Sequence, residues 1–495
     1  MPPQEVLYAE NQTLKAEVAQ LKVQIEWLKR KIFGGGQSET LDRAQLMLAL
    51  GQLQAQLPAA RPTATVTYQR PLGREKRPLT ADTFAHLPVQ ETQTIVPAEV
   101  TANPDAFEQI AEEVTFEVDI IPPKLVKREF RRPKFRRKND VTAAPIVAPA
   151  PARAVPGGYV SAGLIAYVAV AKYLRHLPLY RLAQMSQEWG APIARQSMAD
   201  WMRIAAEWGE VIYRAMLKEL LEGSYIQIDE TPIRYCDPDE KVGRTQQGYL
   251  WAVSHPQGDV VFDWRLSRRH GEVPQLIGED YQGLLQSDGY EGYAAYCKHR
   301  PAVTWLGCWA HLRRHFFEAQ SENPRVVLAV LKMIARMYRR EAAWTEEKIS
   351  TEERTRRRAG PEGLKRTMEA LRKLAQRMLE QKRVLQKSQL GVACTYLLNQ
   401  WEPLSAHLRH GASQLDNNKI ENAIRPTALG KKNWLFFGHP DAGKRSAVLY
   451  SLIISCLRHR KDPHAYLRDI LTRLPRMTNQ EDITPLMPKN WVPAS

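Results

Sequence analysis

Three acidic residues stand where a carboxylate side chain could take part in catalysis. Asp229 lies inside the apolar run SYIQIDETPI, where an ionised carboxylate is costly unless a positive charge compensates it. Asp288 follows LLQS and opens a turn, so its side chain can project into a cleft at the end of a strand. Glu421 lies in LDNNKIENAIRP, which predicts a helix that follows Asn417 and Asn418. We expect these three acids to form one catalytic site.

These residue types suit phosphodiester chemistry on DNA, which needs an activated oxygen nucleophile and neutralisation of charge at phosphorus. Two Mg²⁺ ions about 4 Å apart supply both, and carboxylate oxygens are the ligands that Mg²⁺ prefers. Mn²⁺ could replace Mg²⁺ at such a site. Most single Asp and Glu residues are solvated surface residues, so the prediction depends on three acids on separate elements. The neighbouring Glu230 should point to the opposite face of its strand and is not included in the predicted site.

The elements that would position these acids begin at residue 224, where the periodicity changes. SYIQIDETPI, GYLWAVSHP and DVVFDWRLS read as three short strands with turn residues between them. A short helix, HGEVPQLI, and a fourth strand, GLLQS, follow. Three strands, a helix and a fourth strand are the opening order of a ribonuclease-H-like sheet. We therefore predict a multidomain α+β protein with a ribonuclease-H-like α/β catalytic core.

Length, charge and cysteine content indicate the kind of partner and the compartment. The 495 residues carry a formal net charge of +16, which favours several domains and a polyanionic partner. The five scattered cysteines form no C-x-x-C pair, as expected in a reducing cytosol. No secretory signal is visible, and the longest apolar runs are too short to cross a bilayer. We expect a cytoplasmic, nucleoid-associated bacterial protein without a membrane partner.

Residues 6–33 carry a heptad pattern. Leucines recur at heptad position d, and Asn, Val and Ile recur at position a. This pattern favours a parallel two-stranded coiled coil and hence a homodimer or higher assembly. The alternative is a single amphipathic helix that packs on its own protein. The sequence GGG at 34–36 ends the pattern, and a second helix is expected at 38–57.

A densely basic segment precedes the predicted catalytic core. Phenylalanines alternate with its basic residues, which favours contact with phosphate groups over a merely solvated face. The predicted DNA-binding residues of this segment are Lys127, Arg128, Arg131, Arg132, Lys134, Arg136 and Arg137.

Residues 159–222 are predicted to be helical, with a helix-turn-helix pattern inside them. A turn at Gly190–Pro192 separates two helices, and the second begins near Ala194. Arg195 and Gln196 at its start could enter a major groove. Similar patterns also occur in ordinary helical cores, so both interpretations stay open.

Several motifs together resemble the transposases of insertion-sequence family sixty-six. The resemblance rests on YIQIDETPI, LLQSDGYEGY, GCWAHLRRHFFEA and LDNNKIENAIRPTALGKKNWLFFG, and it extends over nearly the whole chain. It implies a DDE transposase (Asp-Asp-Glu) in which Asp229, Asp288 and Glu421 are catalytic metal ligands. It also implies an all-helical insertion between Asp288 and Glu421. Many relatives carry zinc-binding cysteines before the helix-turn-helix, but residues 106–139 here have none, so no zinc is expected.

The predicted organisation follows from these patterns and the resemblance. The boundaries are 1–57 (coiled-coil and helical dimerisation region), 58–105 (linker), 106–140 (basic module without zinc ligands), 141–158 (Ala/Pro linker), 159–222 (helix-turn-helix-like region), 223–317 (first part of the catalytic core), 318–410 (helical insertion), 411–475 (second part of the core) and 476–495 (tail).

Other residues near these motifs carry weaker predictions. Arg425, Lys431 and Lys432 follow Glu421 and are predicted phosphate ligands of the element end. The C-x-x-H spacing of Cys308 and His311 supplies only half of a tetrahedral zinc site, so packing is the favoured interpretation. Trp434 could stack on a base, but a place in the core is the commoner outcome for such a residue.

The predicted activity is DNA transposition: binding of the terminal repeats, Mg²⁺-dependent strand cleavage, and strand transfer to target DNA. The resemblance also suggests that small accessory proteins take part. A catalytically silent DNA-binding regulator and a ribonuclease-H-like nuclease are the alternatives. Inverted terminal repeats flanking the gene would separate both from a transposase.

Overall fold

The computed structural model describes residues 89, 92, 94, 96, 98–106, 123–135, 146–239 and 244–493. The chain divides into two compact units, 1–116 and 117–495. In the first unit the described elements are helix α4 (Ala98–Ala102) and the short 3-10 helix η1 (Pro104–Ala106). The predicted coiled coil at 6–33, together with Arg136 and Arg137, lies outside the described residues.

A mixed sheet forms the centre of the second unit. Its strand order is β5-β4-β3-β6-β7, and the short strand β8 also pairs with β3. β4 is antiparallel to both β3 and β5, whereas β6 and β8 run parallel to β3 and β7 runs parallel to β6. The predicted succession of three strands, a helix and a fourth strand is confirmed. The strands are β3 (Tyr225–Cys236), β4 (Thr245–Ser254), β5 (Val260–Arg265), β6 (Gly283–Gln286), β7 (Val303–Leu306) and β8 (Phe436–Phe437).

Apolar residues on both faces of the sheet explain why helices cover it on both sides. α17 (Pro440–Arg458) covers the free edge of β5, where Ser451 and Ser455 accept hydrogen bonds from backbone N–H groups of the strand. On one face, Lys431 of α16 (Asn418–Trp434) donates to the Thr231 hydroxyl of β3. On the other face, Trp251 of β4 meets Tyr293 of α9 (Glu291–Lys298) with their rings edge to face. The short helix α8 (Glu272–Ile277) connects β5 to β6. The central strand β3 is therefore enclosed, which gives a polar side chain on it a functional or structural meaning.

The helices of residues 159–222 do not form a core of their own. They are α5 (Ala162–Tyr173), α6 (Leu179–Glu188) and α7 (Arg195–Glu222). Their buried side chains belong to the same hydrophobic cluster as the sheet, α16 (Asn418–Trp434), α17 and α18 (Pro463–Arg473). The predicted helix, turn and second helix are all present, with Gly190 at φ 106° in the turn. Most of α7 packs inside the molecule, and only its beginning resembles an exposed reading helix.

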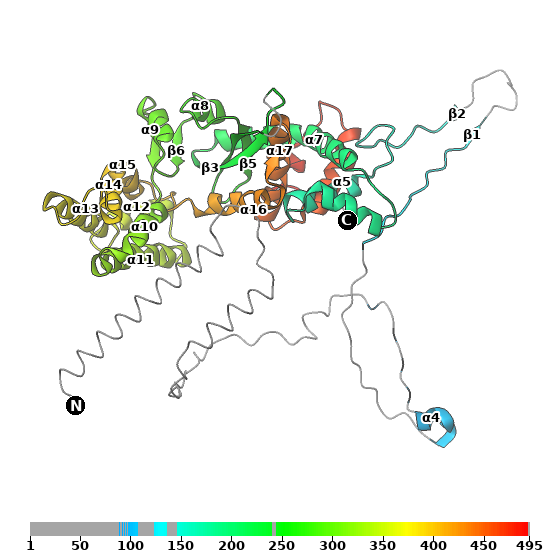
Figure 1. Cartoon of the computed structure of the whole chain (residues 1–495), viewed down its shortest axis with the longest axis horizontal. Helices are drawn as coiled ribbons and strands as arrows, with labels where there is room; N and C mark the ends of the chain where they lie inside the picture. Colours follow the sequence, from blue (N-terminus) through cyan, green and yellow to red (C-terminus); the bar gives the residue numbers. More distant parts are fainter. Residues whose placement is uncertain are drawn as a thin grey trace, which may run out of the picture. The chain divides into compact units, whose positions relative to one another are not determined.

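Residues 318–410 are helical, as predicted, and have a separate core. Figure 1 shows these helices as a group of their own beside the sheet. Their buried residues form a second hydrophobic cluster, which includes Val327, Met368 and Leu397. The helices are α10 (Trp309–Glu318), α11 (Pro324–Glu346), α12 (Thr351–Ala359), α13 (Lys365–Glu380), α14 (Gln389–Asn399) and α15 (Trp401–Ala406), with 3-10 turns η2 (Ala319–Ser321) and η3 (His407–Arg409).

The basic segment forms a narrow antiparallel ribbon. β1 (Lys134–Phe135) pairs with β2 (Ile146–Val147), which lies in the predicted Ala/Pro linker. The backbone N–H of Leu125 donates to the carbonyl of Trp189 and ties the start of the segment to the turn before α7. No described helix combines the length and apolar character needed to cross a membrane.

Candidate active site

The two predicted aspartates come from adjacent parallel strands: Asp229 lies on β3, and Asp288 follows the end of β6 by two residues. The ladder between β3 and β6 pairs Gln227 with Gln286 as its last partners. Asp229 and Asp288 each follow two residues later, so the same register places them side by side. Neighbouring strands lie about 4.8 Å apart, which allows two carboxylates to share a ligand. Asp288 also accepts a hydrogen bond from the backbone N–H of Tyr290 at 3.0 Å, which fixes the turn before α9.

Asp229 is a carboxylate surrounded by other acids. Burial raises its pKa well above the ordinary value, and the negative charges of Glu230, Asp288 and Glu421 raise it further. Its one described hydrogen bond comes from the backbone N–H of Glu230 at 2.9 Å. The ionised form is therefore unfavourable in the protein alone, and a bound cation would stabilise it.

Glu230 points to the other face of β3, as predicted, but it is electrostatically connected to the site. Its carboxylate pairs with Arg268 and accepts a hydrogen bond from the Tyr293 hydroxyl at 2.6 Å. Arg268 also lies 3.9 Å from an Asp288 carboxylate oxygen and stacks over the ring of Tyr290 at 4.0 Å. The sequence analysis excluded Glu230 from the site because alternation along a strand puts it on the opposite face from Asp229. The structure shows that Arg268 contacts both Glu230 and Asp288 and so links the two.

Two buried glutamines hold the loop that leads to Glu421. Gln227 and Gln286 are fully buried, and the Gln227 amide donates to the Gln286 side-chain oxygen at 2.8 Å. Gln227 also donates to the carbonyl of Asp416 at 3.0 Å, and Gln286 donates to the carbonyl of Gln414 at 2.8 Å. The sequence analysis missed both residues. The available signal was a glutamine two positions before each aspartate, in YIQID and LLQSD.

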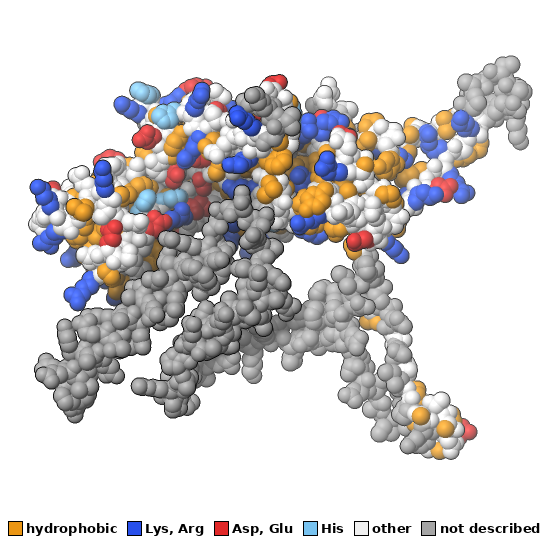
Figure 2. Space-filling view, in the orientation of Figure 1, with side chains coloured by type: hydrophobic (Ala, Val, Ile, Leu, Met, Phe, Trp, Pro, Cys, Tyr) orange, Lys and Arg blue, Asp and Glu red, His pale blue; other side chains and the backbone are white. Residues whose placement is uncertain are grey.

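Glu421 lies in the first turn of α16, directly after this loop. One carboxylate oxygen lies 3.7 Å from Nδ1 of His311, and the other lies 3.6 Å from the guanidinium of Arg314. Both partners come from α10, the first helix after β7. His311 therefore lies beside the predicted catalytic glutamate. Figure 2 shows acidic side chains gathered where the insertion helices meet the sheet.

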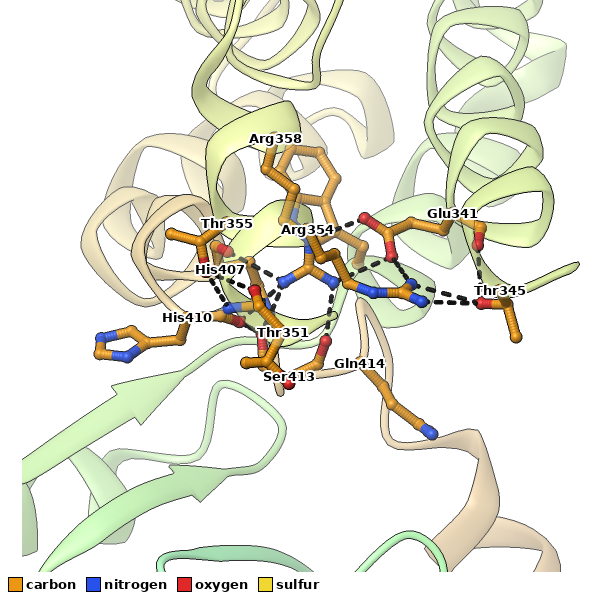
Figure 3. A network of polar contacts seen from close by, with 12 residues as sticks. Glu341, Thr345, Thr351, Arg354, Thr355, Arg358, His407, His410, Ser413 and Gln414 are labelled. Atoms are coloured by element: carbon orange, nitrogen blue, oxygen red, sulfur yellow. Dashed lines mark hydrogen bonds and ion pairs between the residues drawn. The ribbon is translucent and has the colours of Figure 1, made fainter. Parts of the chain in front are cut away.

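A buried arginine fastens the insertion to the same loop. Arg358 of α12 is fully buried, and its guanidinium pairs with both carboxylate oxygens of Glu341, at 2.7 and 3.0 Å (Figure 3). It also donates to the carbonyls of His407, His410 and Ser413 at 2.7–3.0 Å. These contacts satisfy the carbonyl groups of a chain that turns from η3 toward α16.

His407 is also part of this hydrogen-bond network. One ring nitrogen lies 2.7 Å from the carbonyl oxygen of Gly307, and the other lies 2.9 Å from the Ser413 hydroxyl. Burial, aided by the charge of Arg358, lowers the pKa of His407 to about 3, so the ring stays neutral. The insertion, the end of β7 and the loop before α16 are thus held together by hydrogen bonds.

The predicted DNA-binding residues fall into three places. Arg195 and Gln196 are exposed at the start of α7, and the described residues of the basic segment are exposed as well: Lys127, Arg128, Arg131, Arg132 and Lys134. Arg425 and Lys432 are exposed on α16, at spacings from Glu421 that place all three on one helix face.

Lys431 has a different environment. Its ammonium group donates to the Thr231 hydroxyl at 3.1 Å and to the carbonyl of Pro232 at 2.9 Å. Burial lowers its pKa. It therefore holds α16 against β3 in the structure. Trp434 likewise packs inward, stacked on Phe437 with ring centroids 4.9 Å apart, as the commoner outcome predicted.

The donor set suits a hard divalent cation. Asp229, Asp288 and Glu421 offer carboxylate oxygens, and one Glu421 oxygen is buried without a hydrogen-bond partner. The mutual repulsion that raises the pKa of Asp229 is the charge that such an ion would neutralise. The residues present therefore fit the predicted metal.

Comparison with known proteins identifies the family. Residues 157–445, more than half of the chain, match a family model described as Transposase IS66 family, and residues 451–489 match the IS66 C-terminal element. The uncharacterized protein y4jD of Sinorhizobium fredii (strain NBRC 101917 / NGR234) is 29% identical over 97% of this chain and 96% of its own length. The uncharacterized protein y4qI of the same strain is 29% identical over 83% of this chain and 77% of its own length. The chain belongs to the IS66 family of transposases.

Proposed function

We propose that this protein is a DDE transposase that binds the terminal repeats of its element, cuts DNA there and joins the freed ends to target DNA. The carrying observation is that Asp229 on β3 and Asp288 just after β6 extend the register of this strand pair, and that the charges of Asp288 and Glu421 both act on Asp229. The strand order β5-β4-β3-β6-β7 and the helical insertion before α16 support a ribonuclease-H-like core.

Each residue has a defined part in this proposal. Asp229, Asp288 and Glu421 would hold two Mg²⁺ ions, which activate the attacking oxygen and neutralise charge at phosphorus. Arg268 holds Glu230 beside the site and limits the repulsion on Asp288. Arg314 and His311 restrain the Glu421 carboxylate from the α10 side. Gln227 and Gln286 keep the loop before α16 at a fixed distance from both aspartates.

DNA binding would use the exposed basic residues. Arg425 and Lys432 share a helix face with Glu421 and are suited to the phosphates of the strand being cut. Arg195 and Gln196 would read bases in the major groove. The basic segment would contact the phosphate backbone of the DNA with the Lys and Arg side chains that line its ribbon (Figure 2). Residues 6–33 would join two copies, so that one assembly holds both element ends.

The test is cleavage of DNA that carries the element's own ends, with Mg²⁺ or Mn²⁺ present. Wild type is compared with Asp229→Asn, Asp288→Asn and Glu421→Gln. Glu291→Gln is the matched control, because Glu291 is an exposed acid three residues after Asp288. We expect wild type and the control to cut at the ends, and each site variant to bind DNA but cut at least about 1,000-fold more slowly.

Three outcomes would overturn the proposal. Cleavage by the site variants at the wild-type rate would mean that these acids are not catalytic. Binding without cleavage by wild type, with either metal and with cell extract added to supply accessory proteins, would favour a regulator. Cleavage of RNA–DNA hybrids without preference for element ends would favour the nuclease alternative.

A further inference from the structure

A second set of potential metal ligands lies on the α10 side of Glu421. Among the described residues, the thiol of Cys308, a ring nitrogen of His311 and a carboxylate oxygen of Glu421 lie within 4.8 Å of one another. Cys308 stands immediately before α10, His311 lies in its first turn, and Glu421 approaches from α16. The sequence alone supplied the Cys-His pair, and the fold adds the third ligand from more than a hundred residues away.

The spacing suits one small tetrahedral ion. Zinc bonds of about 2.0–2.3 Å to nitrogen, oxygen and sulfur place ligand atoms roughly 3.3–3.7 Å apart. His311 Nδ1 and the Glu421 oxygen are already 3.7 Å apart, too far for a hydrogen bond. Both atoms are buried and have no hydrogen-bond partner. A shared cation would satisfy both atoms, with the imidazole proton on Nε2 and the Nδ1 lone pair facing the ion.

The thiol of Cys308 lies inside the protein beside the other two ligands. Cys308 is fully buried, which raises the pKa of its thiol to about 12, so an ion that binds there has to displace the thiol proton. Asn417 is also fully buried, and neither atom of its side-chain amide has a hydrogen-bond partner.

We propose that Cys308, His311 and Glu421 form a binding site for a thiophilic divalent ion of the zinc class, with water as a fourth ligand. The thiol and imidazole select Zn²⁺ over Mg²⁺, because Mg²⁺ prefers oxygen ligands. This site departs from the expectation of no zinc, which rested on the cysteine-free segment 106–139. Arg314 faces the second carboxylate oxygen of Glu421 at 3.6 Å, so it can stay there while the first oxygen binds the ion.

Occupancy has a consequence that rests on the proposed function. Both ion sites use the Glu421 carboxylate, so an ion held by Cys308 and His311 competes with Asp229 and Asp288 for this ligand. Zinc-class ions are therefore inhibitors of Mg²⁺-dependent cleavage in this protein. The ion leaves the two aspartates in place, because they are fixed by the β3–β6 ladder.

The experiment uses Co²⁺ as a spectroscopic probe for the full-length chain. Wild type should bind one Co²⁺ per chain at this site, with a thiolate-to-cobalt charge-transfer band that Zn²⁺ removes and Mg²⁺ does not. Cys308→Ser should lose the band. Cys297→Ser is the matched control, since Cys297 is a half-buried cysteine of α9 outside the cluster, and it should keep the band. His311→Ala should weaken Co²⁺ binding by at least about 100-fold, beyond the loss typical of outer-shell partners.

Thermal unfolding of each variant checks that a lost band does not reflect a lost fold. A band that persists in Cys308→Ser, or no band in well-folded wild type, overturns the proposed site. The inhibitory consequence is tested separately, as the ratio of cleavage with and without Zn²⁺ in wild type and in Cys297→Ser. A cobalt band without any Mg²⁺-dependent cleavage would overturn the proposed function and leave the ion site standing.

Discussion

The two halves of the candidate active site are positioned in different ways. Asp229 and Asp288 lie on neighbouring strands, and the backbone ladder between β3 and β6 sets their relative position. Glu421 lies on a helix that the chain reaches only after the whole insertion, and buried polar side chains hold its loop. The first half depends on main-chain pairing, which almost any side chain tolerates. The second half depends on particular glutamine, arginine and histidine residues.

The comparison teaches where the site is vulnerable. A substitution in the aspartate half that keeps the strands intact should change chemistry without changing the fold. A substitution in the supports of Glu421 should change both, because it leaves buried polar groups without partners. The following predictions separate these two kinds of effect, beginning with the largest.

Removing the arginine that fastens the insertion should have the largest effect. Arg358→Met leaves three buried carbonyl groups without their charged donor, and leaves Arg354 as the remaining arginine partner of Glu341. Breaking one side of a buried ion pair costs about 3–5 kcal/mol. We expect a loss of that size in the free energy of unfolding, measured with chemical denaturant.

The neighbouring Arg357→Met is the control. Arg357 is partly exposed and pairs with Glu353 and Glu347 at the surface, so its loss should change stability little. Equal effects of the two substitutions would show that Arg358 does not fasten the loop, and the contrast between the two halves would fail.

A substitution at the junction of the two halves should have an intermediate effect. Gln286→Leu removes the acceptor for the Gln227 amide and the donor to the carbonyl of Gln414. Unsatisfied buried polar groups cost about 1–3 kcal/mol, and the loop before Glu421 should loosen. Hydrogen exchange at residues 414–417 should become faster, whereas the exposed Gln282→Leu should not change it. Unchanged exchange in Gln286→Leu would mean that the loop is held by other contacts.

A substitution in the aspartate half should stabilise the protein, whereas the substitutions above should destabilise it. Burial and neighbouring acids raise the pKa of Asp229, so the folded protein binds more protons than the unfolded chain, and stability falls as pH rises between the two pKa values. Without metal, Asp229→Asn should therefore be more stable than wild type near neutral pH. The advantage should disappear below about pH 4, where the unfolded chain is also protonated.

Melting temperatures at both pH values measure this effect, with the exposed Asp280→Asn as control. Added Mg²⁺ should stabilise wild type more than Asp229→Asn, because ligand binding to the folded state raises its stability. A lower melting temperature for Asp229→Asn at neutral pH would contradict the repulsion described here.

The smallest effect is expected at the surface of α16. Lys432 is exposed, whereas the adjacent Lys431 is hydrogen-bonded to β3. Lys432→Ala should leave stability unchanged and reduce the slope of DNA affinity against salt concentration by about 1. Lys298→Ala, an exposed lysine at the end of α9, is the control. An unchanged slope would place the DNA on another face.

The sequence predicted the aspartate half well because its signals are local. Apolar runs with turn residues between them indicated β3, β4, β5 and β6 in order, and the structure confirms this order. The helix of Glu421 and the helical character of 318–410 were also predicted correctly. The predictions for 6–33 and for the DNA-binding residues stay predictions.

The supports of Glu421 could not be predicted from the sequence, because they join residues that are far apart in it. Arg358 is one of three consecutive arginines in TEERTRRRA, and nothing local distinguishes the buried one from its exposed neighbours. The third member of the Cys308–His311 cluster likewise comes from another helix. The core shared by α7 and the sheet was missed for the same reason, since an amphipathic helix does not reveal its partner.

The hydrogen bond from the N–H of Trp309 to the carbonyl of Leu415, at 2.9 Å, brings the beginning and the end of the insertion together. The chain between Trp309 and Leu415 starts and ends at this hydrogen bond. Its length therefore does not alter the separation of β7 and α16. Helices between these two residues could therefore change in number without moving the candidate active site. What the junction requires is that the first and last residues of this segment can hydrogen-bond beside Glu421.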